Sequence, residues 1–273
     1  MPLDQDFSFR SFAQHTFYGK VNLDLLEQAG IGPGQRVVEL ACGTGAVTRL
    51  ILERLRGAKE SLVIAIDHSA LAIKQAMEEL KNVRASAVQF IQSKAEELPK
   101  VVQGRVDAVI FCNGIHYIPD KETLVERVSQ TLKPGGTFAF NTSFFQGAQP
   151  PETQQFYRRW MLKALRILKE KHGLSLPHGQ KVEARRYLTP EQYVALVEGH
   201  SLQLKGKEVK EVPVPLEAWL DISSYQDFIE GILPGLPLSI ARQVLQEGVT
   251  RTFEELGIQS VPRNWLAIVA VKA

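Results

Sequence analysis

Glycines and carboxylates stand at the end of an apolar segment in the first quarter of the chain. Gly43 and Gly45 follow the run 36–40, and Glu39 lies four residues before Gly43. A glycine turn lets the backbone approach a ligand, because no Cβ blocks the turn or the ligand and the free N–H groups of a following helix point at it. The sequence therefore predicts a small-molecule site at this turn.

The residue at the third glycine position of the motif indicates the kind of ligand. Dinucleotide enzymes use Gly-x-Gly-x-x-Gly, with a pyrophosphate on the helix N-terminus. Here Thr48 replaces the third glycine. Glu39 would repel a pyrophosphate, but not a cationic or hydroxyl-bearing ligand. The pattern favours a cofactor without phosphates, and a nicotinamide-dependent oxidoreductase remains the alternative.

A second acid, Asp67, ends the apolar run 61–67, 22 residues after Gly45. A carboxylate can accept both hydroxyls of a ribose, and each hydrogen bond to a charged group contributes roughly 1.5–3 kcal/mol. Asp67 therefore indicates a nucleoside ligand without choosing between cofactors. The structural alternative is that Asp67 or Ser69 caps a helix over 70–82.

A third polar group follows the buried run 106–113. Asn113, His116 and Tyr117 lie at its end, and in open parallel sheets ligands bind beyond the carboxyl ends of the strands. His116 is the best-placed general base, with Tyr117 beside it. A histidine that merely supports the loop is the alternative.

Hydrophobic periodicity predicts the elements that position these residues. Strands are expected over 36–40, 61–67, 88–92, 106–113, 137–142, 202–213 and 265–271, and helices over 21–29, 46–55, 70–82, 120–132, 151–172 and 188–197. Thr189 is the predicted N-cap of the last of these helices, with Pro190 in its first turn.

The run Glu39-Leu-Ala-Cys-Gly43-Thr-Gly45 resembles motif I of the class I S-adenosylmethionine-dependent methyltransferases. The turn Leu132-Lys-Pro-Gly-Gly136 is similar to one that recurs in these enzymes. The resemblance covers most of residues 36–145 and is weaker beyond them. Within the class, the chain is similar to the group that includes the quinone-biosynthesis (type 11) methyltransferases. It implies an α/β fold with a doubly wound, Rossmann-like, mixed seven-stranded sheet whose strand seven is antiparallel.

The resemblance also implies site residues. The expected cofactor contacts are Tyr18, Glu39, Ala41, Gly43, Gly45, Asp67, His68, Ala95, Glu96 and Asn113. One position departs from the family pattern, because Lys94 stands where an acid often meets the adenine amino group. Either Glu96 substitutes for that acid, or the adenine contact is made by backbone alone.

The resemblance and the composition of the chain also predict its domain organisation. Residues 1–35 would form an N-terminal helical lid, and 36–145 the cofactor-binding core. Two insertions, 146–187 and 215–260, after strands five and six, would form a helical cap, and 188–214 and 261–273 the remainder of the core sheet.

The residues of the two insertions predict the kind of acceptor. Apolar residues there predict a roomy pocket for a small, lipophilic or aromatic acceptor; they include Trp160, Trp219, Phe228 and Ile229. The same residues could instead form the cap's own core. The pairs Arg158-Arg159 and Arg185-Arg186 could hold an acidic acceptor or be a solvated face.

The predicted function is transfer of a methyl group from S-adenosylmethionine to a small-molecule acceptor by in-line displacement, with S-adenosylhomocysteine as product. A nucleic-acid or protein methyltransferase would be expected to show a polar signature such as Asn-Pro-Pro-Tyr, where this chain has Asn113-Gly-Ile-His116. Cyclopropane-forming enzymes share the motifs. A non-catalytic S-adenosylmethionine-binding protein is a further alternative.

The amino-acid composition limits which partners and which location we expect for the protein. The 273 residues hold 32 basic and 30 acidic side chains, a net charge of +2 that gives no footprint for nucleic acid. No apolar run of membrane-spanning length and no signal-peptide pattern is seen, so we expect a cytoplasmic protein without membrane insertion. Cys42 and Cys112 indicate neither a disulfide framework nor a metal site. The oligomeric state is left open.

Overall fold

The computed structural model describes residues 7–83, 87–176 and 187–273. Contacts divide the chain into two compact units. We call residues 16–148, 186–210 and 265–273 the core unit, and residues 1–15, 149–185 and 211–264 the helical unit. The roles of lid and cap assigned from the sequence stay predictions.

A seven-stranded sheet has the order β3-β2-β1-β4-β5-β7-β6. Its strands are β1 Arg36–Leu40, β2 Leu62–Asp67, β3 Ala87–Gln92, β4 Val106–Cys112, β5 Leu132–Thr142, β6 Leu202–Pro215 and β7 Ser260–Lys272. The first five strands pair in parallel, and β7 runs antiparallel to β5. The strand order reverses between β1 and β4, as in a doubly wound fold, so the predicted fold class is confirmed.

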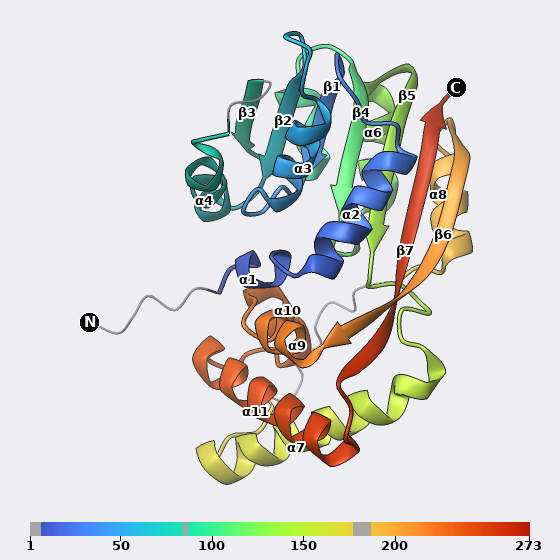
Figure 1. Ribbon diagram of the computed structural model, residues 1–273. Coiled ribbons are helices and arrows are strands. Elements are labelled where there is room, and N and C mark those ends of the chain that lie inside the picture. The colour runs from blue at the N-terminus through green and yellow to red at the C-terminus, as the bar shows by residue number, and fades with distance from the viewer. Residues whose placement is uncertain (1–6, 84–86, 177–186) are drawn as a thin grey trace. The chain divides into compact units, whose positions relative to one another are not determined.

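Helices cover both faces of the sheet in the core unit. Its helices are α2 Thr16–Gln28, α3 Ala46–Arg54, α4 Ala70–Leu80, α5 Leu98–Val101, α6 Lys121–Thr131 and α8 Pro190–Glu198. Figure 1 shows α2 and α3 in front of the sheet and α6 and α8 behind it. The central strands are buried on both sides, so β1 and β4 consist almost wholly of buried residues.

Two helix starts follow from local sequence. Thr189 and Gln192 form a capping box at the start of α8, as the sequence predicted. Ser69, not Asp67, caps α4, because the Ser69 hydroxyl accepts a hydrogen bond from the Ala72 N–H at 3.2 Å. Asp67 is thereby left for another role.

Strand β5 begins earlier than its predicted start at residue 137. Leu132 already pairs with Val106 of β4, and a register shift follows before Ala108 pairs with Thr137. The Leu-Lys-Pro-Gly-Gly segment is therefore an irregular start of the strand and not a separate turn. Gly136 fits there because a Cβ would lie 2.9 Å from the Lys133 carbonyl oxygen.

The aromatic N-terminal segment is shared between the two units. Residues 7–15, with α1 Arg10–Ala13, belong to the helical unit, where the Gln226 N–H donates to the Phe7 carbonyl at 3.0 Å. His15 Nε2 lies 2.8 Å from a carboxylate oxygen of Asp221. Helix α2, which starts at Thr16 and not at residue 21, belongs to the core unit.

The helical unit is built on α7 and α11 and has its own aromatic core. Besides α1, its helices are α7 Gln154–His172, α9 Leu216–Ile222, α10 Gln226–Ile232 and α11 Leu238–Leu256. Trp160, Trp219, Phe228 and Ile229 are all buried, with the two indole rings 5.4 Å apart. The rings of Trp219 and Phe228 both pack on Trp160, which agrees with the alternative that these residues form the unit's own core. The Arg185-Arg186 pair lies outside the described residues.

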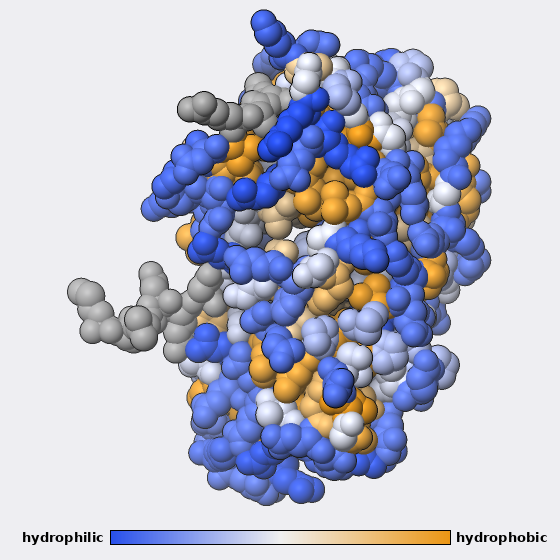
Figure 2. All heavy atoms as spheres, in the orientation of Figure 1, coloured by the Kyte–Doolittle hydropathy of each residue, from blue (hydrophilic) through white to orange (hydrophobic). Residues whose placement is uncertain are grey.

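The surface in Figure 2 is mostly hydrophilic, with hydrophobic side chains gathered in smaller patches. None of the described helices is both long and apolar enough to cross a membrane. Within the same residues, no cluster of three His, Cys, Asp or Glu could hold a metal ion.

Candidate cofactor and acceptor site

The predicted site residues meet at one edge of the sheet. Leu40, near the end of β1, pairs with Ile66 of β2 and with Phe111 of β4. Because these strands are parallel neighbours, the residues that follow them lie side by side. This is the edge at which open α/β sheets bind ligands.

The glycine turn after β1 is left-handed at three positions. The φ angles are 53° at Ala41, 53° at Gly43 and 85° at Gly45. At Gly45, an added Cβ would lie 3.0 Å from Leu80 Cδ1 and 3.2 Å from Ala76 Cβ of α4. Glycine is therefore required twice over at Gly45, by backbone conformation and by helix packing. Helix α3 begins directly after it, with its free N–H groups at the turn.

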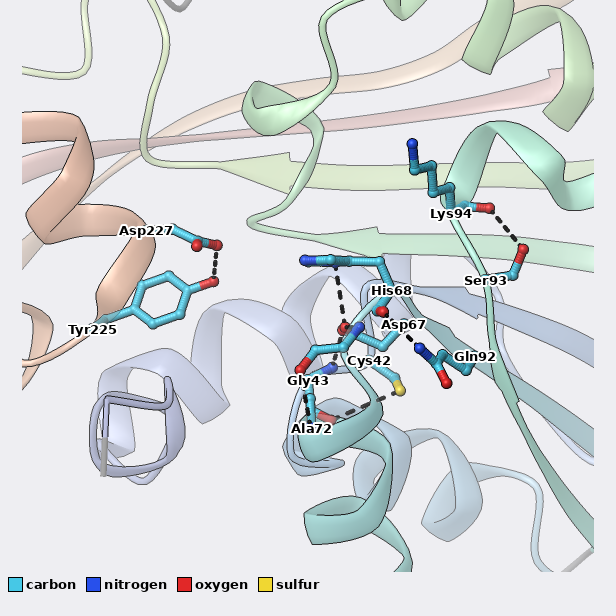
Figure 3. A network of polar contacts seen from close by, with 11 residues as sticks. Cys42, Gly43, Asp67, His68, Ala72, Gln92, Ser93, Lys94, Tyr225 and Asp227 are labelled. Carbon is cyan, nitrogen blue, oxygen red and sulfur yellow. Dashed lines mark hydrogen bonds and ion pairs between the residues drawn. The ribbon is translucent and has the colours of Figure 1, made fainter. Parts of the chain in front are cut away.

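Asp67 ties the ends of β1 and β2 together. One carboxylate oxygen accepts the Gly43 N–H and the other accepts the Ser69 N–H, both at 2.9 Å (Figure 3). His68 is largely exposed, and its Nδ1 lies 3.5 Å from Asp67. Each oxygen has further lone pairs, so Asp67 can still accept the two hydroxyls of a ribose. The side chain thus fits the predicted nucleoside.

Glu39 is buried beneath the turn, with 2% of its surface exposed. The Thr48 hydroxyl donates to Glu39 Oε2 at 2.5 Å. Burial is the main reason why the pKa of Glu39 is raised to about 8, and the Asp67 charge raises it further while Thr48 lowers it. Thr48 was seen in the sequence only as a missing third glycine, and its role as partner of Glu39 was missed. A hydroxyl nine residues after a strand-end acid is the signal that could have revealed it.

Replacing Glu39 by glutamine is expected to remove a pH dependence of stability. In the unfolded chain the carboxyl loses its proton near pH 4.5, whereas in the folded protein it keeps it to about pH 8. The folded state binds more protons in this window, so wild-type stability should fall as pH rises through it, by up to a few kcal/mol. Urea unfolding at a series of pH values measures this. Parallel pH profiles for Glu39→Gln and wild type would contradict it.

The segment predicted to meet adenine follows β3. The Ser93 N–H donates to the Asp67 carbonyl at 2.9 Å, which places this segment beside the ribose acid. Ala95 starts a short 3-10 turn, and Glu96 is half-exposed, while Lys94 is exposed. Figure 3 shows Ser93 and Lys94 next to Gln92 at the end of β3. The choice between Glu96 and a backbone contact to adenine stays a prediction.

Asn113, just past β4, is held in a left-handed conformation with φ 48°. Its N–H donates to Asn141 Oδ1 at 2.9 Å, and its own Oδ1 accepts the N–H and hydroxyl of Ser143. Asn141 Nδ2 donates in turn to Asn22 Oδ1 of α2 at 2.8 Å. Sequence reasoning missed Asn22 and Asn141, because residues 119 apart are brought together only by the fold. The strain and the buried network both mark a constrained loop.

His116 is buried in an aromatic group at the same strand ends. Its ring stacks on Phe144 with centroids 4.3 Å apart and lies 4.1 Å from the Tyr117 ring. His116 Nδ1 is 3.2 Å from the Thr142 hydroxyl, which also accepts the Phe144 N–H. When Nδ1–H donates to Thr142, Nε2 carries the lone pair that a general base needs. Thr142 and Phe144 were not singled out from the sequence.

Tyr18 of α2 is buried at 5% exposure, with its ring 6.2 Å from that of Trp265. Burial raises its pKa, and the neighbouring Cys112 and Glu39 raise it further, while a hydrogen bond with Asn22 acts in the opposite direction. The phenol is therefore neutral and can act as a hydrogen-bond donor but not as a base. Its predicted contact with the cofactor stays a prediction.

Comparison with protein families gives a match to the methyltransferase domain over residues 31–211, about two thirds of the chain. The chain belongs to the methyltransferase domain family. The prediction of an S-adenosylmethionine-dependent methyltransferase is thereby confirmed, and with it the cofactor class. The match contains the glycine turn, Asp67 and the loop after β4, but not Tyr18 and Asn22 of α2.

Individual relatives agree with this family. The chain is 32% identical over 127 residues to the ubiquinone/menaquinone biosynthesis C-methyltransferase UbiE of Cronobacter sakazakii, covering 46% of this chain and 48% of that protein. With the same enzyme of Allorhizobium ampelinum it is 27% identical over 166 residues, covering 60% and 63%. The match thus spans about half the length of the first relative.

Solved structures extend the likeness of fold to almost the whole chain. The cyclopropane synthase MmaA2 from Mycobacterium tuberculosis matches with a TM-score of 0.58 and 12% identity, covering 93% of this chain and 84% of that one. At this identity the likeness shows the fold alone.

Proposed function

We propose that this methyltransferase transfers the methyl group to a small, lipophilic or aromatic acceptor by in-line displacement, at the edge of the sheet formed by the ends of β1, β2 and β4. The observation that carries the proposal is the aromatic group of His116, Tyr117 and Phe144 beside the strained Asn113 loop. Flat aromatic side chains favour stacking with a flat acceptor. The C-methyltransferase names of the relatives support a quinone-like or phenolic ring with a carbon nucleophile.

The residues divide into holding and reacting groups. Asp67 and the Gly43–Gly45 turn would hold the nucleoside, and the buried Glu39 would face the cationic part of the cofactor. When bound, S-adenosylmethionine supplies a methyl group on a sulfonium, which makes the carbon electrophilic. His116 would take the proton of a phenolic or enolic acceptor at Nε2, with Nδ1 positioned by Thr142. Removal of that proton makes the acceptor a stronger nucleophile.

The proposal is tested with methyl-labelled S-adenosylmethionine and a panel of hydroquinones, phenols, catechols and aliphatic acids, with products identified by mass spectrometry. Labelled product from a ring acceptor is expected. Product from aliphatic acids alone would overturn the aromatic assignment. Binding of S-adenosylhomocysteine without product from any acceptor would favour the alternative of a non-catalytic binding protein.

Substituting His116 by glutamine is expected to lower kcat by about 10²- to 10⁴-fold, the usual contribution of a general base. The KM for S-adenosylmethionine should stay nearly unchanged, since the proposed nucleoside contacts are elsewhere. A wild-type kcat that rises with pH, and a flat profile in the variant, would support the role. An unchanged kcat would show that the ring only supports the loop.

We propose the cytoplasmic location that was expected from the sequence. The partner is a small molecule and not nucleic acid, in keeping with the nearly balanced charge.

A further inference from the structure

The exposed side of α7 carries an unusual combination of side chains. We call Arg158, Leu162, Leu165, Arg166 and Lys169 the α7 stripe. Leu162 is 58% exposed and Leu165 37% exposed, although large apolar side chains are normally turned inward. At about 100° per residue, these five positions fall within roughly 100° of arc on the helix. They therefore form one continuous surface.

The opposite side of α7 fixes this orientation. Trp160 and Ala164 are buried against α11, where the Trp160 indole N–H donates to the Leu245 carbonyl at 2.8 Å. At Gly248, an added Cβ would lie 3.1 Å from the Ala164 backbone nitrogen. The two helices are thus in close contact, and α7 cannot turn its stripe inward without breaking this packing.

The stripe carries an excess of positive charge. The basic side chains next to it are paired, because Arg159 and Lys163 both contact Glu255, and Lys171 contacts Glu247. Arg158, Arg166 and Lys169 make no ion pair with any residue that the structure describes. The single acid within α7, Glu170, stands four residues after Arg166, a spacing at which helix side chains are neighbours, so it offsets that one charge in part and leaves Arg158 and Lys169 without an acid of the same helix beside them. Positive charge and apolar surface therefore coincide here.

Helix α4 shows that exposed apolar residues alone do not make such a surface. Leu71 is 62% exposed and Met77 is 55% exposed. On the same helix one cation, Lys74, stands with two acids, Glu78 and Glu79, and Glu78 pairs with Lys81 just beyond the helix end. This helix therefore offers apolar contact without an excess of positive charge, and serves as a natural comparison.

We propose that the α7 stripe docks the protein on an anionic lipid surface. A helix with cations and leucines on one exposed side lies in the headgroup region, where the cations meet lipid phosphates and the leucines enter the acyl boundary. Three cations, of which Glu170 offsets only Arg166 in part, and two leucines supply both parts of this interaction. The benefit rests on the proposed function, because a lipophilic acceptor concentrates in the bilayer, but the docking itself needs neither cofactor nor acceptor.

Vesicle sedimentation of the full chain tests the proposal. Wild type should bind vesicles of equal parts phosphatidylglycerol and phosphatidylcholine far better than pure phosphatidylcholine, and raising sodium chloride from about 0.05 M to about 0.5 M should weaken binding. The triple variant Arg158→Glu, Arg166→Glu, Lys169→Glu should lose at least on the order of 100-fold in partition coefficient, at about fivefold for each cation removed. Leu162→Gln with Leu165→Gln should reduce the binding that persists at high salt.

Two controls match these variants. The triple reversal Arg56→Glu, Lys59→Glu, Lys74→Glu changes net charge equally at exposed sites of the core unit, and Leu71→Gln with Met77→Gln removes the apolar pair of α4. Both should bind like wild type. Equal loss in both triple variants, or no vesicle binding by wild type, would overturn the proposal, as would binding of acidic proteins but not of vesicles through α7. Because no methyl transfer is measured, failure here is distinguishable from failure of the proposed function.

Discussion

Replacing Gly45 by valine is expected to abolish binding of S-adenosylhomocysteine. The residue has φ 85°, which a β-branched side chain adopts only under strain. Its Cβ would in addition lie 3.0 Å from Leu80 and 3.2 Å from Ala76. Either α4 moves away or the turn refolds, and both displace Gly43 from its hydrogen bond to Asp67. Isothermal titration should show no heat of binding at millimolar ligand.

A matched control separates strain from the loss of the site. Gly30 also has positive φ, 67°, but nothing lies within 4 Å of its added Cβ. Gly30→Val should cost about 1–2 kcal/mol of stability through strain and leave binding intact. Gly45→Val should cost more, by about a further 1–3 kcal/mol for overpacking, in thermal unfolding. Normal binding by folded Gly45→Val protein would refute the proposed position of the cofactor.

The second large effect is expected for Asp67→Ala. The change removes the acceptor of the Gly43 and Ser69 N–H groups and the proposed acceptor of two ribose hydroxyls. Hydrogen bonds to a charged group contribute roughly 1.5–3 kcal/mol each, so the affinity for S-adenosylhomocysteine should fall by 100-fold or more. Titration calorimetry with NAD(H), run in parallel, checks that neither the wild type nor Asp67→Ala binds this dinucleotide.

Asp107 offers the control for this variant. It too accepts a backbone N–H, from Arg36 at 2.8 Å, and it pairs with Lys133 at 2.7 Å. Asp107 stands near the start of β4, at the opposite edge of the sheet from Asp67. Asp107→Ala should therefore lower stability and leave cofactor affinity unchanged. A similar loss of affinity in both variants would mean that Asp67 acts only through stability.

The glycine turn and Asp67 could be placed from the sequence because their signals are local. Apolar runs that end in Gly43 or Asp67 predict buried strands, and parallel strands bring such ends together. The partners of these residues could not be predicted in this way. Thr48 lies only nine residues after Glu39, and that spacing was overlooked. The contact of Asn22 with Asn141 depends on how α2 crosses the sheet, and no spacing in the chain encodes it.

The predicted boundaries failed where neighbouring segments decide the structure. Leu132 joins β5 because Val106 offers it a pairing partner, although Pro134 and the glycines that follow indicate a turn. Phe7 lies in the helical unit while Tyr18 is buried in the core unit, and composition alone gave no sign of a division between them.

Because β6 is an outermost strand of the sheet, its side chains also affect the tendency of the protein to aggregate at high concentration. A strand at the end of a sheet order offers unpaired backbone groups to any other chain. Along its exposed stretch β6 places Lys205 and Lys207, with Glu208 next to them. Charged side chains of this kind make it unfavourable for β6 to pair with an edge strand of another copy. The charged side chains of β6 thereby disfavour the use of this edge as a template for fibrous aggregation.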